Sequence, residues 1–278
     1  MMSRQILIFV LLIILNTTTI VSAVRCHNDN CSISLNYTTD TIIDTTNCTF
    51  TVTDACFTSL SIKLHSGEGS FSTYPANADL TPMFLLHNRA LDSLTTAIWF
   101  RKKLMTQLFT YTCTSDSFCG EDRAQQIYHQ AKMLNFDSVW SNLAESLHQS
   151  STNNNPTCMN ERNEATTCNG GVCQASFSSE SDVITRACVS PRGTVDPTGL
   201  IMSTSNAASL QLQSTVIYSC NKDRCNDDTT INRVKQILMD SNLFNTTKPT
   251  IISNSAVGHY SCFGTFTFLS LLTFVVWY

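Results

Sequence analysis

The sequence contains little positive charge. Lys and Arg together number 17 in 278 residues, against 21 Asp and Glu, so the formal net charge is −4. A protein that binds nucleic acid needs a clustered basic face, and the one basic run, residues 101–103, is most simply a solvated surface. We therefore predict no nucleic-acid partner.

Catalytic and cofactor motifs are also missing. The segment "GEGSFS" at 67–72 is not the Gly-x-Ser-x-Gly elbow of α/β hydrolases, and no pair of His residues one helical turn apart accompanies a Glu. Neither a glycine-rich phosphate loop nor a redox-type Cys-x-x-Cys pair occurs. The segment "HNDNC" offers His27 and Asp29 to a metal, but the nearby cysteines are expected to be oxidised. We predict no enzyme, no cofactor and no metal.

The apolar run at the amino end is too short to cross a bilayer. Arg4 precedes apolar residues 6–15, and the small residues Ser22 and Ala23 follow. This pattern predicts a cleaved secretory signal peptide at 1–23, and a buried amino-terminal helix is the alternative.

The apolar run at the carboxyl end is short as well. Small residues at 253–256, a polar spacer and an uncharged tail at 263–278 match an attachment signal for a glycosylphosphatidylinositol (GPI) anchor. A helix of this tail would span only about 24 Å of a roughly 30 Å bilayer core. We predict attachment at Asn254 and a location on the extracellular face of the plasma membrane, held in the outer leaflet by the lipid. A transmembrane helix is the alternative.

Cysteines are abundant. Thirteen occur, and the predicted loss of Cys262 with the tail leaves twelve in two sets of six, separated by a polar linker that ends at Pro156. Each set ends in a small ring that follows a Tyr, in "YTCTSDSFCGED" at 111–122 and "YSCNKDRCNDD" at 218–228. The secreted context predicts sugar at the sequons of Asn36, Asn47 and Asn245.

Helical spacing follows each ring. Apolar residues lie three and four apart after the first ring and again after the second, where each segment has an acidic start. The positions are Ala124, Ile127, Tyr128, Ala131 and Leu134, then Ile231, Val234 and Leu238. Another helix is predicted with Asp137 as its cap, burying Phe136, Trp140, Leu143 and Leu147.

The second set of cysteines also carries strand signals. Residues 170–178 and 182–189, joined by a polar tip, predict a β-hairpin, and 214–220 predicts a strand that returns to the ring. Some seventy residues of short strands bury little core, so the disulfides are expected to contribute about 2–4 kcal/mol each.

These segments together resemble the three-finger superfamily of snake neurotoxins, lymphocyte-antigen-six proteins and the urokinase receptor. "CNGGVCQASFSSESDVITRACV" is followed by "VIYSCNKDRCND", which has the family ending of Cys, four residues, Cys and Asn. The resemblance implies the bridges Cys158–Cys173, Cys168–Cys188 and Cys220–Cys225. It also implies that Asn226 bonds to backbone at the base of the fingers. Two family bridges have no counterpart, so a looser third finger is expected.

The first set resembles the same superfamily less closely. "TDACF" at 53–57 is similar to the middle-finger cysteine segment, which implies the bridges Cys26–Cys56, Cys31–Cys48 and Cys113–Cys119. Gly120 stands where the family has Asn. Residues 57–112 are interpreted as an insertion, with helix-like spacing at Leu91, Leu94, Ile98 and Trp99.

The predicted fold class is small, disulfide-rich and mainly β, with two three-finger-like domains and added α-helices, α+β overall. The predicted organisation is a signal peptide (1–23), a diverged first unit with an insertion (24–122), a helical segment and polar linker (123–156), a three-finger-like domain (157–228), a helix and stalk (229–254) and a removed attachment signal (255–278).

The functional hypothesis is a non-enzymatic cell-surface protein that binds an extracellular or membrane protein, or modulates a receptor, through disulfide-clamped loops. If the family habit holds, the fingers make the contacts; the candidates are Phe177, Glu180, Asp182, Arg186 and Arg192.

The alternative hypothesis is a secreted or surface-bound hydrolase whose site lies in residues 57–112. Its acid-base groups would be His65, Asp79, His87 and Asp92, which must then converge in one pocket. A purely structural coat protein is a third possibility.

Overall fold

The structure is a computed structural model that describes residues 24–27, 31–36, 39, 42–53, 55–76, 91–113, 120–150, 155–190, 198–207 and 213–244. These residues all belong to one compact unit, Met1–Lys248. The predicted signal peptide, Asn254 and the attachment signal lie outside the described residues. None of the helices in the described ranges has the length and hydrophobicity needed to cross a bilayer.

Most of the regular structure is β. The strands are β1 (Val24–His27), β2 (Ser32–Asn36), β3 (Phe50–Thr53), β4 (Cys56–Lys63), β5 (Glu68–Pro75), β6 (Leu91–Trp99), β7 (Leu104–Cys113), β8 (Thr157–Met159), β9 (Ala165–Thr167), β10 (Val172–Ser178), β11 (Thr185–Val189), β12 (Gly199–Ala207) and β13 (Gln213–Cys220). The helices are α3 (Glu121–Met133), α4 (Phe136–Leu147) and α5 (Asp228–Asp240). With five disulfides in the described residues, the chain forms a disulfide-rich, mainly β fold.

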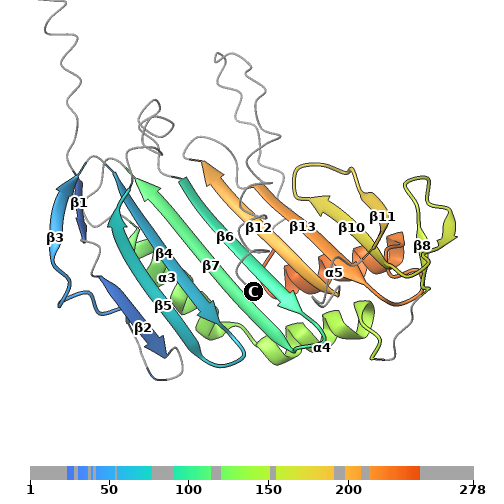
Figure 1. The fold of residues 1–278 in the computed structure, drawn as a ribbon, viewed down its shortest axis with the longest axis horizontal. Helices are drawn as coiled ribbons and strands as arrows, with labels where there is room; N and C mark the ends of the chain where they lie inside the picture. The colour runs from blue at the N-terminus through green and yellow to red at the C-terminus, as the bar shows by residue number, and fades with distance from the viewer. Residues whose placement is uncertain are drawn as a thin grey trace, which may run out of the picture. The chain divides into compact units, whose positions relative to one another are not determined.

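A single nine-stranded sheet passes through both sets of cysteines (Figure 1). Its order is β11-β10-β13-β12-β6-β7-β4-β5-β2, and two small sheets, β1-β3 and β8-β9, lie beside it. The two sets meet where β6 pairs antiparallel with β12 along nine residues, from Leu91–Ala207 to Trp99–Gly199. Gly199 permits this close approach, because a Cβ there would lie 2.7 Å from the carbonyl oxygen of Ile98.

The strand order repeats within the sheet. We call β1–β7 with α3 and α4 the first half, and β8–β13 with α5 the second half. In the first half the order is β5-β4-β7-β6, with β2 added beside β5, and in the second it is β11-β10-β13-β12. The cysteines occupy the same register in both, with Cys56 opposite Cys113 and Cys173 opposite Cys220. Because the corresponding strands β6 and β12 run antiparallel, the halves are related by an approximate two-fold rotation.

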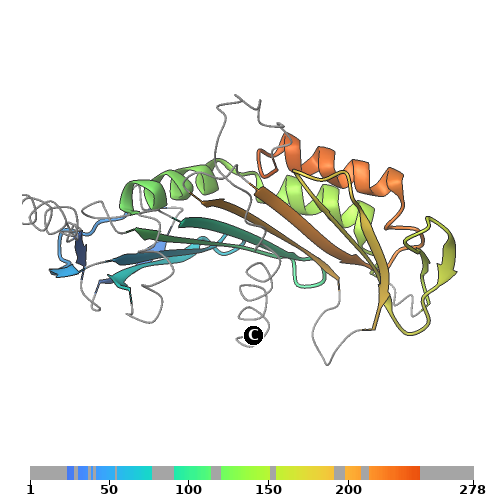
Figure 2. The ribbon, with the colours of Figure 1, turned by 90° about the horizontal axis from the view of Figure 1, so that it is seen from above.

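The three helices cover one face of the sheet (Figure 2). Side chains that point toward them alternate with side chains on the open face: in β4, buried Leu60 and Ile62 alternate with half-buried Ser59 and Ser61. The buried cluster includes sheet residues Leu60, Phe71, Phe109, Leu200 and Val216 and helix residues Tyr128, Leu143, Val234 and Leu238. This core is larger than the sequence analysis expected, because helices from both halves share it.

The helices form where the sequence predicts them, with differences in α4, which buries Val139, Leu143, Ala144 and Leu147 while Phe136 and Trp140 are only half-buried. In α3 and α5 the apolar stripes are buried, and each helix has acidic residues in its first turn, where the helix dipole favours them. The predicted cap Asp137 is wrong. Asn135 caps α4 instead, and its side chain accepts a hydrogen bond from the backbone N–H of Ser138 at 3.1 Å.

Residues 57–112 contain no helix in their described part. They supply β4, β5, β6 and β7, so the helix-like spacing at 91–99 was misleading. Since β6 has paired neighbours on both edges, its backbone is fully used by the sheet, and Thr95, Thr96 and Ile98 are β-branched residues that suit a strand.

Candidate functional site

Disulfides close the base of each half. The second half contains Cys158–Cys173, Cys168–Cys188 and Cys220–Cys225, and the first contains Cys26–Cys56 and Cys31–Cys48. These are the pairs that the three-finger resemblance implies. The sixth pair includes Cys119, which lies outside the described residues.

Asn226 joins β8 to β10 in the second half and directly follows Cys225. Its side-chain oxygen accepts from the Met159 N–H at 2.8 Å, and its amide nitrogen donates to the carbonyls of Met159 (2.9 Å) and Gln174 (3.1 Å). We call these three bonds the Asn226 clamp. Beside it, the Tyr218 hydroxyl donates to the Cys225 carbonyl at 2.9 Å. Burial raises the pKa of Tyr218, so the hydroxyl keeps its proton and remains a donor.

Arg186 is used inside the fold, so its prediction as a partner contact is wrong. Arg186 is only 8% exposed. Its Nε donates to the Asn226 carbonyl at 2.9 Å, and its guanidinium pairs with Asp228 at the start of α5. An arginine so enclosed by its own chain, with two of its nitrogens bonded internally, offers little surface to a partner. The sequence indicated Asp228 only as part of the acidic start of a helix.

Phe177 is likewise not a partner contact. It is 2% exposed, its ring packs edge-on against Phe244 with 5.6 Å between centroids, and the Lys235 ammonium lies 5.0 Å from its centroid. The alternation in β10 places Phe177 on the helix-covered face. The sequence predicted a strand here but not which of its faces α5 would cover.

The tip of the β10–β11 hairpin carries the exposed candidates. Glu180 and Asp182 are exposed there, and Val183 beside them is 67% exposed. Two hydroxyls shape the tip: Ser178 Oγ accepts from the Ser181 N–H at 3.2 Å, and Ser181 Oγ accepts from the Val183 N–H at 3.0 Å. Arg192 lies outside the described residues.

The hairpin is also tied to its neighbour. The backbone N–H of Ser179 donates to the Ser214 carbonyl at 2.8 Å, and the Ser214 N–H donates to Ser179 Oγ at 3.0 Å. The acidic tip therefore stands on a base that is held by Cys168–Cys188, by the sheet and by this pair of bonds. Val183 was not among the predicted contact residues. The sequence shows it after Glu180 and Asp182 and shortly before β11.

The first half has a different contact where the second half has its clamp. His27 follows Cys26 as Met159 follows Cys158, and its Nε2 lies 2.6 Å from Glu121, which follows the first ring. Gly120, at the position of Asn226, has φ of 82°, and a Cβ there would lie 2.9 Å from Thr58 Oγ1. A side chain is thus excluded at 120, and the contact of His27 with Glu121 connects β1 to α3.

His27 also lies near two sulfur atoms, those of Cys31 and Cys48. A metal would need thiolates, and in this structure the two sulfurs form a disulfide. Asp29, the other residue considered for a metal, lies outside the described residues.

The acid-base groups of the hydrolase hypothesis do not meet where they are described. His65 Nδ1 lies 3.5 Å from the Met105 carbonyl, whereas Asp92 pairs with Tyr111 at the other end of β7. Six residues at about 3.3 Å each separate these positions by roughly 20 Å. Asp79 and His87 lie outside the described residues.

Two of the predicted glycosylation sites are accessible. Asn36 ends β2 at an edge of the sheet and Asn47 lies in a turn, and both residues are exposed. Asn245 lies outside the described residues.

Comparison with protein-family models found no match, and neither did comparison with curated protein sequences. The fold and the site together define a small, disulfide-rich, mainly β protein whose described disulfides close the bases of two strand arrays.

Proposed function

We propose that the chain is a non-enzymatic extracellular binding protein made of two three-finger-like halves, which engages a protein partner through the acidic tip at 179–184. The observation that carries this proposal is the tip itself. Glu180, Asp182 and Val183 project from a hairpin whose base is held by a disulfide and by the Asn226 clamp. A loop so preorganised loses little conformational entropy on binding.

The repeated strand order supports the three-finger interpretation of both halves. Each half contains two hairpins, and the first strand of one pairs with the last strand of the next, β4 with β7 and β10 with β13. A small two-stranded sheet accompanies each half, β1-β3 and β8-β9. In this interpretation residues 57–112 are the second and third fingers of the first half rather than an insertion.

The chemistry of the tip indicates a partner with a basic surface around a small apolar depression. The carboxylates of Glu180 and Asp182 precede the exposed Val183 in the chain, and no basic residue occurs at 179–184. Complementary charge accelerates association and is screened by salt, so the partner's binding weakens as ionic strength rises.

A substitution series tests the tip. Glu180→Ala, Asp182→Ala and Val183→Ala combined are expected to weaken binding of residues 24–248 to intact cells of the source organism by about tenfold or more, because the three side chains supply the charge and apolar contact. Residues 24–248 would be linked into a fluorescently labelled tetramer, and its binding to the cells would be measured by flow cytometry at two salt concentrations.

The matched control changes the same three residue types elsewhere. Val52, Asp122 and Glu161 are exposed on β3, α3 and the β8–β9 turn, and their combined replacement by Ala is expected to leave binding unchanged. Equal binding by the tip variant and the unchanged chain would reject the tip as the contact surface.

We further propose that the mature chain is held at the cell surface by a GPI anchor attached at Asn254. The small residues at 253–256 and the uncharged tail that follows support this. Phosphatidylinositol-specific phospholipase C is expected to release most of the protein from intact cells into the medium, as measured by immunoblot. A chain that stays with the cells, while a known anchored protein is released, would favour the transmembrane alternative.

A further inference from the structure

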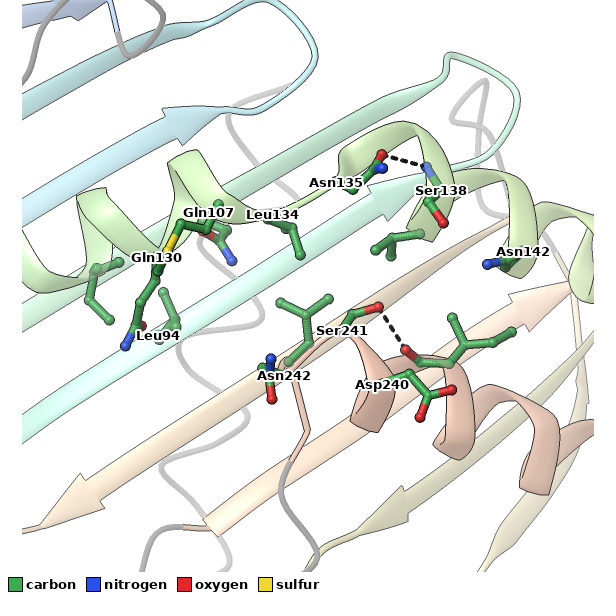
Figure 3. A pocket seen from close by; sticks show the side chains of 15 residues that line it. Leu94, Gln107, Gln130, Leu134, Asn135, Ser138, Asn142, Asp240, Ser241 and Asn242 are labelled. Carbon is green, nitrogen blue, oxygen red and sulfur yellow. Dashed lines mark hydrogen bonds between the residues drawn. The ribbon is translucent and has the colours of Figure 1, made fainter.

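A pocket of about 600 Å³ lies over the middle of the sheet, in the space between the α3–α4 corner and the end of α5 (Figure 3). Leu94 of β6 and Gln107 of β7 contribute from the sheet, and the helices and the turn after α5 supply the rest. Its apolar lining includes Leu94, Ile127, Leu134, Val139, Ile237 and Leu243. The volume is within the range of pockets that hold small organic molecules.

Gln107 places an unpaired polar group in this pocket. The residue is only 4% exposed, its Nε2 donates to Thr96 Oγ1 at 3.3 Å, and its Oε1 has no hydrogen-bond partner within the described part of the chain. Turning the amide does not help, since the Thr96 hydroxyl then donates to the oxygen and leaves the nitrogen unpaired. A buried polar atom without a partner lowers stability, so its presence needs a reason.

The lining chemistry restricts the ligand. Among the described residues around the pocket there is no Lys, Arg or His to bind an anion, and the one carboxylate, Asp240, already accepts from Gln236 at 2.7 Å. The rim adds uncharged polar groups such as Asn142 and Ser241, and the thioether side chain of Met133, a residue that is 78% exposed. Such a site favours an uncharged molecule over a carboxylate or phosphate.

We propose that this pocket binds a small, uncharged, amphipathic molecule. Its aliphatic part packs among Leu94, Ile127 and Val139, and its hydroxyl or amide group completes the hydrogen bonding of Gln107. This site is independent of the acidic tip, which lies in the β10–β11 hairpin and contributes no lining residue.

Octan-1-ol and octanoate are the probes, because they share a chain length and differ in charge. Isothermal titration of residues 24–248 is expected to show octan-1-ol binding at least tenfold more tightly than octanoate. Gln107→Leu is expected to weaken octan-1-ol binding about tenfold, the cost of one hydrogen bond of about 1.4 kcal/mol. The same variant is expected to melt at the same temperature or higher, because it removes the unpaired atom.

Two controls separate the pocket from general effects. Gln174→Leu makes the same change on the open face of the sheet and is expected to leave octan-1-ol binding unchanged. Asn142→Trp fills the pocket from an exposed position of α4 and is expected to abolish binding, whereas Ser141→Trp, one residue away and not in the lining, is not. Absent octan-1-ol binding, equal binding of octanoate, or unchanged binding by both Gln107→Leu and Asn142→Trp would each overturn the proposal.

Discussion

Cutting the chain between Ser150 and Asn155 is expected to leave two fragments that stay together as one particle. The cut separates α4 from β8, but β6 and β12 remain paired along nine residues. Ile98, Leu200 and Met202 at this junction are 1% exposed, so their burial on the helix-covered face also holds the fragments. No described disulfide joins the two halves, so association must come from the sheet and the core.

Contacts of α4 add to the junction. The Asn221 N–H donates to the Leu147 carbonyl at 3.2 Å, and the Asn221 side chain both accepts from the Gln149 N–H and donates to the Gln149 carbonyl, at 2.7 and 2.8 Å. Arg233 of α5 pairs with Glu145 of α4 at 2.9 Å. Since α4 remains with the first fragment and α5 with the second, these contacts also oppose separation.

The measurement is size-exclusion chromatography at micromolar concentration, after cleavage at a protease site inserted in the linker. A denaturing gel shows two fragments, and the native elution volume is expected to stay that of the uncut chain. In the same cut chain Gly199→Val is expected to separate the fragments, because a Cβ at 199 would meet the Ile98 carbonyl at 2.7 Å. Fragments of the unchanged sequence that elute apart would show two independent domains instead.

Replacing Asn226 by Leu is expected to lower the free energy of unfolding by about 3–5 kcal/mol. The residue is fully buried, and the change leaves the Met159 N–H and the carbonyls of Met159 and Gln174 without their partner. The polar groups remain buried while the bonds are lost, which is the costly case. Equilibrium unfolding in guanidinium chloride, with the disulfides intact, measures the change.

Asn221→Leu is the matched control. Asn221 also makes side-chain bonds to backbone, through its two bonds with Gln149, but there the partners are exposed and water can replace the lost bonds. The expected loss is about 1 kcal/mol or less. Equal losses for the two variants would mean that burial of the Asn226 clamp does not decide its contribution.

The two halves connect their first strand to the segment after the last cysteine through different residues. In the second half a neutral amide at 226 binds the backbone of β8, whereas in the first half His27 of β1 contacts Glu121 of α3. The sequence showed the absence of Asn at 120 but not the substitute, because His27 and Glu121 are 94 residues apart and neither lies in a recognisable motif.

Local patterns predicted much of the second half and all three described helices. The hairpin of β10 and β11, the returning strand β13 and the stripes of α3 and α5 each follow from periodicity within a dozen residues. The interpretation of 91–99 failed, because Leu94 and Ile98 are four apart and satisfy a helical period, while the sheet on both sides of β6 decided its conformation.

Predictions of the contact residues failed where a second element was involved. Phe177 and Arg186 lie close in sequence to the polar tip. Only the position of α5, with Lys235 and Asp228, shows that both side chains are covered. Glu180 and Asp182 are exposed as predicted from a polar turn, because a hairpin tip has no neighbouring layer to cover it.

What the sequence by itself determined are the features set within short stretches of chain: the ring after Tyr218, the helical stripes of α3 and α5, and the β10–β11 hairpin. What only the tertiary structure decided are the pairing of β6 with β12, the helix-covered core and the pocket above Gln107. The physical reason is that strands pair through backbone groups that every residue carries, so the sequences of β6 and β12 taken separately do not show that these two strands are partners. Which strand pairs with an exposed sheet edge depends on the other sheet edge within reach and on the helices that bury the joined sheet.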